Sequence, residues 1–131
     1  MFKIVDGPID EIALEDDVRT DADGAVIVFR GVARRHSRGR DVVHLEYEAY
    51  PEMAEKVMAQ IGDEITARWP ISRVAIVHRT GVLEIGQASV VIAIAVMVTV
   101  VPVAAIVVTV IIVVVIGAAR DHQEGSSGNH Q

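Results

Sequence analysis

The sequence predicts an α+β fold with a mixed or antiparallel sheet, and three observations carry that prediction. Residues 43–49 alternate between apolar and polar side chains, which is typical of a strand with one face in solvent. Residues 51–68 place apolar side chains at helical spacing, which predicts an amphipathic helix. Residues 25–29 and 74–77 are short apolar runs, and such runs favour strands of the core.

The N-terminal part is expected to contain a strand, a helix and a second strand. Residues 2–5 predict the opening strand, which Gly7-Pro8 ends. An acidic helix follows, because four apolar residues share one face there: Ile9, Ile12, Ala13 and Leu14. A turn at residues 21–24 leads into the run at 25–29, which we expect to be a core strand, and a basic loop at 30–41 comes next.

The long helix at 51–68 has signals at both ends. Pro51 fits its first turn, because the backbone donor that proline lacks has no helical partner there. Trp69-Pro70 ends it. Beyond the strand at 74–77, Gly81 and Gly86 bound a further short strand. The expected core face of the helix consists of Met53, Val57, Met58, Ile61 and Ile65.

Composition narrows the classes of function. The chain has 131 residues, 51% of them hydrophobic, and a net charge of −6, so it suits one domain with an apolar core. It has no cysteine, which excludes a disulfide framework, a thiolate zinc site and a cysteine nucleophile. The acidic balance and the 4% aromatic content argue against a nucleic-acid partner. Residues 1–10 do not resemble a signal peptide, so we expect a cytoplasmic protein.

The C-terminal part contains a long uncharged segment, Ile85 to Ala119. Within it, Val90 to Ile116 is dominated by valine and isoleucine, with Thr99 and Thr109 as its polar members. Its length reaches that of a membrane helix, whereas β-branched side chains favour strands. Three interpretations follow: a membrane helix, which is not the favoured one, buried strands broken near Pro102, or a stretch read out of frame.

These changes in composition divide the chain into three parts. Residues 1–95 form the α+β domain, and residues 96–119 are the anomalous apolar segment. Residues 120–131 are polar and rich in small residues, so we expect a disordered tail.

A basic segment between residues 30 and 40 is the strongest candidate for a functional site. Guanidinium groups offer planar pairs of donors that match phosphate and carboxylate geometry, so the segment predicts an anion site. The ligand would be a phosphorylated small molecule or an acidic protein tail. The alternative is a solvated loop that balances the acidic N-terminal part. The segment contains Arg30, Arg34, Arg35, His36, Arg38 and Arg40.

Other polar residues give weaker indications. His78 and Arg79 directly follow an apolar strand, so they could add charge to the anion site or make structural contacts at the strand end. His44, Glu46 and Glu48 are better explained as the wet face of a strand than as metal ligands. The sequence predicts neither a bound metal nor a cofactor.

Five motifs, in the same order along residues 1–95, resemble the large, catalytic subunit of molybdopterin synthase. They are Gly24-Ala-Val-Ile-Val-Phe-Arg-Gly31, Arg34-x-His36-x-x-Gly39, Leu45-x-Tyr47-x-Ala49-Tyr50-Pro51-x-Met53-Ala54, Arg68-Trp69-Pro70, and Val77-His78-Arg79-x-Gly81-x-Leu83-x-x-Gly86.

This resemblance implies an α/β-hammerhead domain that forms a homodimer in molybdenum cofactor biosynthesis. The partner would be a small ubiquitin-like sulfur carrier with a C-terminal Gly-Gly thiocarboxylate. Sulfur would pass from it to cyclic pyranopterin monophosphate, giving molybdopterin. The resemblance implies that the pterin substrate is bound by Arg34, Arg35, His36 and Arg38, with Ala33 and Arg79 as further candidates.

The resemblance ends before the part of the family that completes catalysis. In the family a His-Arg pair follows the last of these motifs. When the family's spacing is carried forward without gaps, the positions of that pair are occupied by Val98 and Thr99 in this chain. The family also has catalytic lysines near its C-terminus, whereas no lysine follows Lys56 here. The catalytic residue is therefore not assigned. The alternative to an active sulfurtransferase is an inactive relative that binds or scaffolds, associated with a membrane through residues 90–116.

Overall fold

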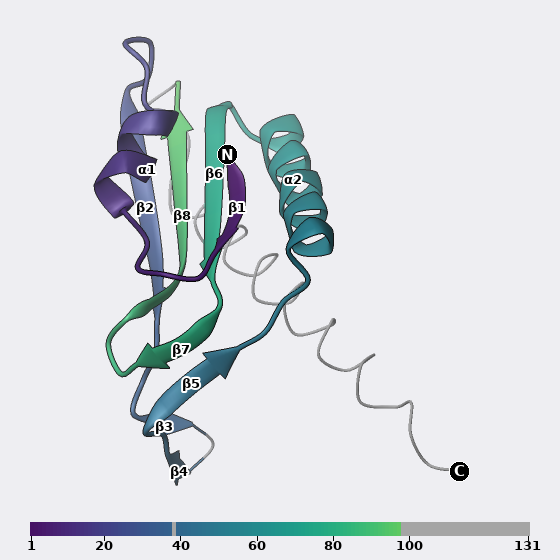
Figure 1. The fold of residues 1–131 in the computed structure, drawn as a ribbon. Coiled ribbons are helices and arrows are strands. Elements are labelled where there is room, and N and C mark those ends of the chain that lie inside the picture. Colours follow the sequence, from purple (N-terminus) through teal and green to yellow (C-terminus); the bar gives the residue numbers. More distant parts are fainter. Residues whose placement is uncertain (38, 98–131) are drawn as a thin grey trace. The chain divides into compact units, whose positions relative to one another are not determined.

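The centre of the fold is a four-stranded mixed sheet. The computed structural model describes residues 1–37 and 39–97. In the sheet, β1 (Phe2–Val5) runs parallel to β6 (Ile71–Arg79), and the other pairs are antiparallel. The strand order is β1-β6-β8-β2, with β8 (Ala88–Val96) inside and β2 (Ala25–Val32) at one edge (Figure 1). This mixed sheet confirms the α+β class.

Two helices and two small two-stranded sheets complete the described part of the chain. Helix α1 packs on β8 and β6, whereas α2 packs on β1 and β6. Strand β5 pairs with β7, and β3 pairs with β4, both antiparallel. The bounds are α1 (Glu11–Val18), β3 (His36–Ser37), β4 (Arg40–Asp41), β5 (His44–Tyr47), α2 (Pro51–Arg68) and β7 (Gly81–Glu84).

Helix α1 is fixed by a cap and by one buried face. The side chain of Asp10 accepts a hydrogen bond from the backbone of Ala13 at 3.0 Å, which satisfies an unpaired donor of the first turn. Leu14 and Val18 are buried in one hydrophobic cluster with five residues of β6 and β8: Ala75, Val77, Val91, Ala93 and Ala95. Burial of these side chains locks the helix to the sheet.

Helix α2 has the bounds that its sequence predicts. Pro51 opens it, and the backbone of Trp69 closes it with a bond to Ile65. It lies so close to β1 that a Cβ at Gly62 would overlap the ring of Phe2. A glycine in the middle of this helix therefore permits close packing, despite its low helix propensity.

Four local expectations were wrong, because exposure follows tertiary packing and not hydrophobicity alone. Strand β2 lies at an edge of the described sheet, so none of its residues is fully buried, although Val26 packs against the core cluster. Ile12 is 77% exposed, because the core face of α1 is the one that carries Leu14 and Val18. Met53 and Val43 are also exposed, one in the first turn of α2 and the other just before β5.

The first part of the apolar run is a buried strand. Residues 90–96 belong to β8, which pairs with β6 on one side and β2 on the other. The interpretation of residues 90–116 as a membrane helix is therefore wrong for residues 90–96, because they belong to an inner strand of the sheet. Within the described residues, no helix is long and apolar enough to cross a membrane. Pro102 and residues 98–131, including the proposed tail, lie outside the described part.

Candidate functional site

The basic segment is anchored at its root. After a register irregularity between Gly31 and Val32, the chain leaves β2 through Ala33, which is buried. The backbone of Ala33 makes two hydrogen bonds to the turn before β8: its N–H donates to the carbonyl of Gln87 at 2.9 Å, and its carbonyl accepts from Gly86 at 2.7 Å. The arginines that follow therefore extend from a fixed point.

Beyond Ala33 the basic segment forms the β3–β4 hairpin. Arg34, Arg35 and Arg40 are exposed, and within residues 1–37 and 39–97 none of them pairs with a carboxylate. His36 is paired instead, with its Nδ1 2.8 Å from the carboxylate of Asp41 across the hairpin. Arg38 lies outside the described residues. The guanidinium groups of Arg34, Arg35 and Arg40 are therefore exposed and have no carboxylate partner in the described part of the chain.

Arg30 does not belong to this group. It lies on β2, and its guanidinium forms an ion pair and hydrogen bonds with Glu11 in the first turn of α1. Its side chain is directed to the helix and not to the hairpin. Spacing in the sequence could not separate Arg30 from Arg34, because the separation depends on where β2 ends.

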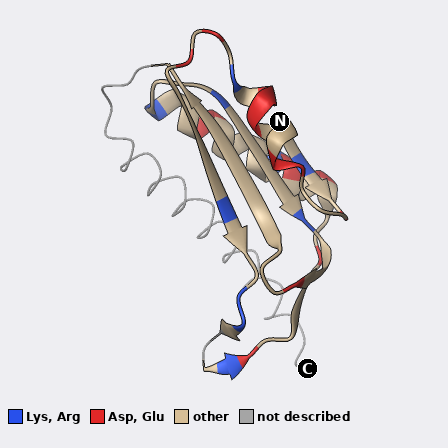
Figure 2. Cartoon of the chain, turned by 90° about the vertical axis from the view of Figure 1, so that its left-hand side faces the viewer, with Lys and Arg blue, Asp and Glu red and all other residues tan. Residues whose placement is uncertain are grey.

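Charge is distributed unevenly over the domain. Figure 2 shows the basic residues of the β3–β4 hairpin at one end and the acidic residues of α1 towards the other end. A concentrated positive region on a chain with a net charge of −6 attracts anions to that end, and salt screens the attraction.

Arg79 is held by structural contacts. Its guanidinium donates to the side-chain oxygen of Gln87 at 3.2 Å and to the carbonyl of Val82 at 3.2 Å. Its Nε is buried and has no hydrogen-bond partner among the described residues. This arrangement fits the structural interpretation of Arg79.

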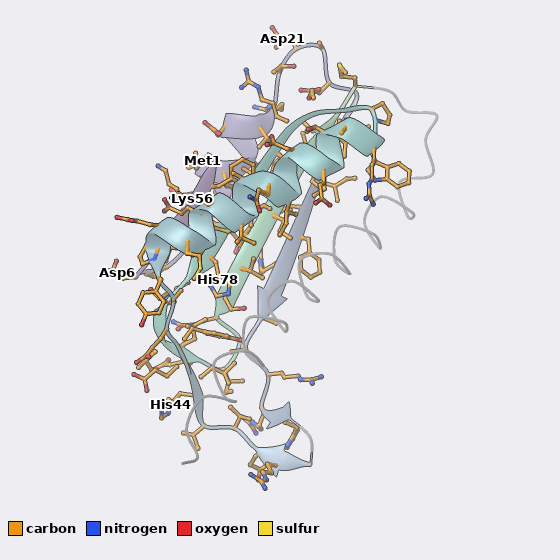
Figure 3. The ribbon with its side chains drawn as sticks, turned by 90° about the vertical axis from the view of Figure 1, so that its right-hand side faces the viewer. Met1, Asp6, Asp21, His44, Lys56 and His78 are labelled. Carbon is orange, nitrogen blue, oxygen red and sulfur yellow. The ribbon has the colours of Figure 1, made fainter. Side chains whose placement is uncertain are left out.

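His78 lies near the end of β6, next to the two-stranded β5–β7 sheet. Its ring packs edge-on against Tyr47, with 5.3 Å between the ring centroids, and its Nδ1 is 2.9 Å from the carbonyl of Arg79. Burial lowers the pKa of His78 below its ordinary value, because the charged imidazolium loses water there. Figure 3 shows His78 close to α2 and His44 farther from that helix, on β5. His78 is therefore suited to a neutral packing role.

The described residues form hollows in two other places. One, of about 240 Å³, lies between β1, β6 and the two helices, and Phe2, Gly62 and Ser72 are among its lining residues. The other, of about 460 Å³, lies at the start of α2 beside Tyr50 and Met53. Arg34 lines neither of these two hollows. No group of three potential metal ligands occurs in the same residues.

Comparison with known proteins identifies the family. Residues 4–98 match the model of the family described as MoaE protein. The chain belongs to the MoaE family. The match ends close to residue 95, where the resemblance of the sequence motifs also stops.

Individual relatives agree with membership of the MoaE family. The molybdopterin synthase catalytic subunit of Halalkalibacterium halodurans is 48% identical over 94 residues, or 72% of this chain. The crystal structure of molybdopterin synthase from Staphylococcus aureus matches with a TM-score of 0.70 at 44% identity, covering 73% of this chain and 70% of that one.

A more distant structure shares the fold. It is a complex of subunits 1 and 2 of molybdopterin-converting factor from Helicobacter pylori, with a TM-score of 0.57 and 20% identity, covering 71% of this chain and 63% of that one. The present chain spans about 60% of the length of the Halalkalibacterium relative.

Proposed function

We propose that the chain acts as the catalytic subunit of molybdopterin synthase, transferring sulfur to cyclic pyranopterin monophosphate to form molybdopterin. The single observation that carries this proposal is membership of the MoaE family over residues 4–98. The relative from Halalkalibacterium, a molybdopterin synthase catalytic subunit, supports the same activity.

The β3–β4 hairpin supplies chemistry that suits such a substrate. A phosphate monoester carries oxygens that accept paired hydrogen bonds from guanidinium groups. Arg34 comes directly after the anchored Ala33, and Arg35 and Arg40 lie on the same small hairpin without carboxylate partners among the described residues. We assign substrate binding to Arg34, Arg35 and His36, together with Arg38, which lies outside the described residues.

The sulfur would come from a partner. A small ubiquitin-like carrier with a C-terminal Gly-Gly thiocarboxylate would supply it, and a chain without cysteine needs such a donor. The complex from Helicobacter pylori contains two subunits of molybdopterin-converting factor, which is consistent with a partner of this kind. We further propose a homodimer and a cytoplasmic location.

The catalytic residue remains unassigned. A lysine suits acid–base or covalent work at a desolvated site, because its pKa shifts readily. The given sequence has lysine at positions 3 and 56 and none after Lys56, so we assign no lysine to catalysis. Formation of product by this chain is therefore measured directly, in addition to binding.

The test combines the full chain with a thiocarboxylated small subunit and cyclic pyranopterin monophosphate. Mass spectrometry measures the dithiolene product, and calorimetry measures binding of each component. Product above the level seen without the chain supports the enzyme. Binding of both components without product would favour an inactive scaffold, and binding of neither would contradict the proposal.

A further inference from the structure

We propose that Gln87 is a positioning residue that fixes the root of the arginine hairpin. It lies at the end of the turn between β7 and β8, outside the basic segment. The inference rests on the proposed function, because it concerns how the residues assigned to the substrate are held. Four hydrogen bonds of Gln87 carry it, two through its side chain and two through its backbone.

The side chain of Gln87 joins two structural elements. Its Oε1 accepts a hydrogen bond from the backbone N–H of Glu84 at 2.9 Å and another from the guanidinium of Arg79 at 3.2 Å. An amide oxygen has two lone pairs, so both donors can be satisfied at once. Arg79 also donates to the carbonyl of Val82, which brings the end of β6 and strand β7 into the same network.

The backbone of the same turn holds the hairpin. Gly86 has φ +88°, a conformation that glycine adopts without strain, and the N–H of Gln87 donates to the carbonyl of Glu84 at 3.1 Å. In this conformation Gly86 and Gln87 bond the two backbone groups of Ala33. Ala33 immediately precedes Arg34, so the geometry of the turn sets where Arg34 begins.

Loss of the Gln87 side-chain oxygen leaves two donors without a protein partner. Arg79 Nε already has no hydrogen-bond partner among residues 1–37 and 39–97, so this guanidinium depends strongly on the bond to Gln87. The turn can then adopt other conformations, and the two bonds to Ala33 weaken with it. Misplaced cationic groups bind a phosphate less well, because paired hydrogen bonds need defined geometry.

The experiment compares Gln87→Leu, which removes the oxygen at similar volume, with Gln87→Glu, which keeps an acceptor. Ser72→Ala is the control, because it removes a side-chain hydrogen bond outside the hairpin and its turn, which Ser72 donates chiefly to the carboxylate of Asp23 at 2.5 Å, with the carbonyl of Ala95 at 3.3 Å. Amide hydrogen exchange at Ala33 and Gly86, calorimetric affinity for cyclic pyranopterin monophosphate and the unfolding temperature are measured in the full chain. Gln87→Asn, which is too short to reach both donors, replaces the leucine variant should that one fail to fold.

We expect Gln87→Leu to speed exchange at Ala33 and Gly86 roughly tenfold and to weaken pterin affinity roughly threefold to tenfold. Gln87→Glu restores slow exchange, and Ser72→Ala changes neither readout. Unchanged exchange in Gln87→Leu, or faster exchange with wild-type affinity, would overturn the inference. If the unmodified chain does not bind the pterin, the proposed function fails separately, and exchange alone decides whether Gln87 holds the hairpin.

Discussion

The four-stranded sheet and the β3–β4 hairpin are stabilised in different ways. In the sheet, inner strands β8 and β6 bury seven and five of their nine residues, and α1 adds Leu14 and Val18 to the core cluster. The hairpin is exposed and charged, and it is fixed mainly through the two backbone bonds of Ala33. The contrast indicates that the two regions have different roles: the packed sheet stabilises the fold, and the hairpin anchored at its root carries exposed charge.

The largest expected effect separates these two regions. Leu14→Ala removes a side chain that is 3% exposed, and such truncations typically cost about 2–5 kcal/mol through lost burial and a residual cavity. Urea unfolding should show this loss, whereas pterin affinity at a temperature where the variant stays folded should match that of the unmodified chain. An equal loss of affinity would show that the sheet and the hairpin are not independent.

A smaller effect is expected at His78, near the end of β6. Because burial lowers its pKa, the unfolded chain binds a proton more readily than the folded one. At a pH above its ordinary pKa of 6.5, His78 is neutral in both the folded and the unfolded chain and does not lower the free energy of unfolding. As the pH drops below 6.5 towards the lower pKa of the folded chain, the unfolded chain takes up the proton first, so the free energy of unfolding falls.

Urea unfolding at about pH 7.5 and about pH 5.5 measures the effect. The unmodified chain should lose more stability on acidification than His78→Phe, which keeps a ring beside Tyr47. His44→Gln serves as the matched control, because it replaces an exposed histidine of β5. The same acid-induced loss in His78→Phe would show that this side chain is not the titrating group.

The sequence predicts the scaffold well, because periodicity reports burial. The spacing of Met58 and Ile65 and the proline at 51 give α2 its observed bounds, and the alternation at 43–49 predicts β5. The sequence does not reveal that β2 lies at an edge, because an apolar run shows the tendency to form a strand but not its place in the sheet.

The candidate site is predictable only in part. The crowded arginines suggest an anion site, but the sequence does not distinguish Arg30 from Arg34. In the structure, Arg30 lies on β2 and pairs with Glu11, whereas Arg34 lies beyond the end of β2, at the start of the hairpin segment. Gln87 carries no sequence signal, because its importance comes from contacts with residues eight and three positions earlier in the chain. A single glutamine after a glycine turn is common, so only the folded geometry identifies it.

The most direct measurement compares the affinity of Arg34→Ala and Arg30→Ala for cyclic pyranopterin monophosphate by calorimetry. Both variants remove one positive charge, but Arg30 pairs with Glu11 and only Arg34 follows the anchored root of the hairpin. We predict that Arg34→Ala weakens binding about tenfold or more, the usual loss for a hydrogen bond to a charged group, while its unfolding temperature is unchanged. Equal affinity of the two variants would contradict the assignment of the substrate to the hairpin.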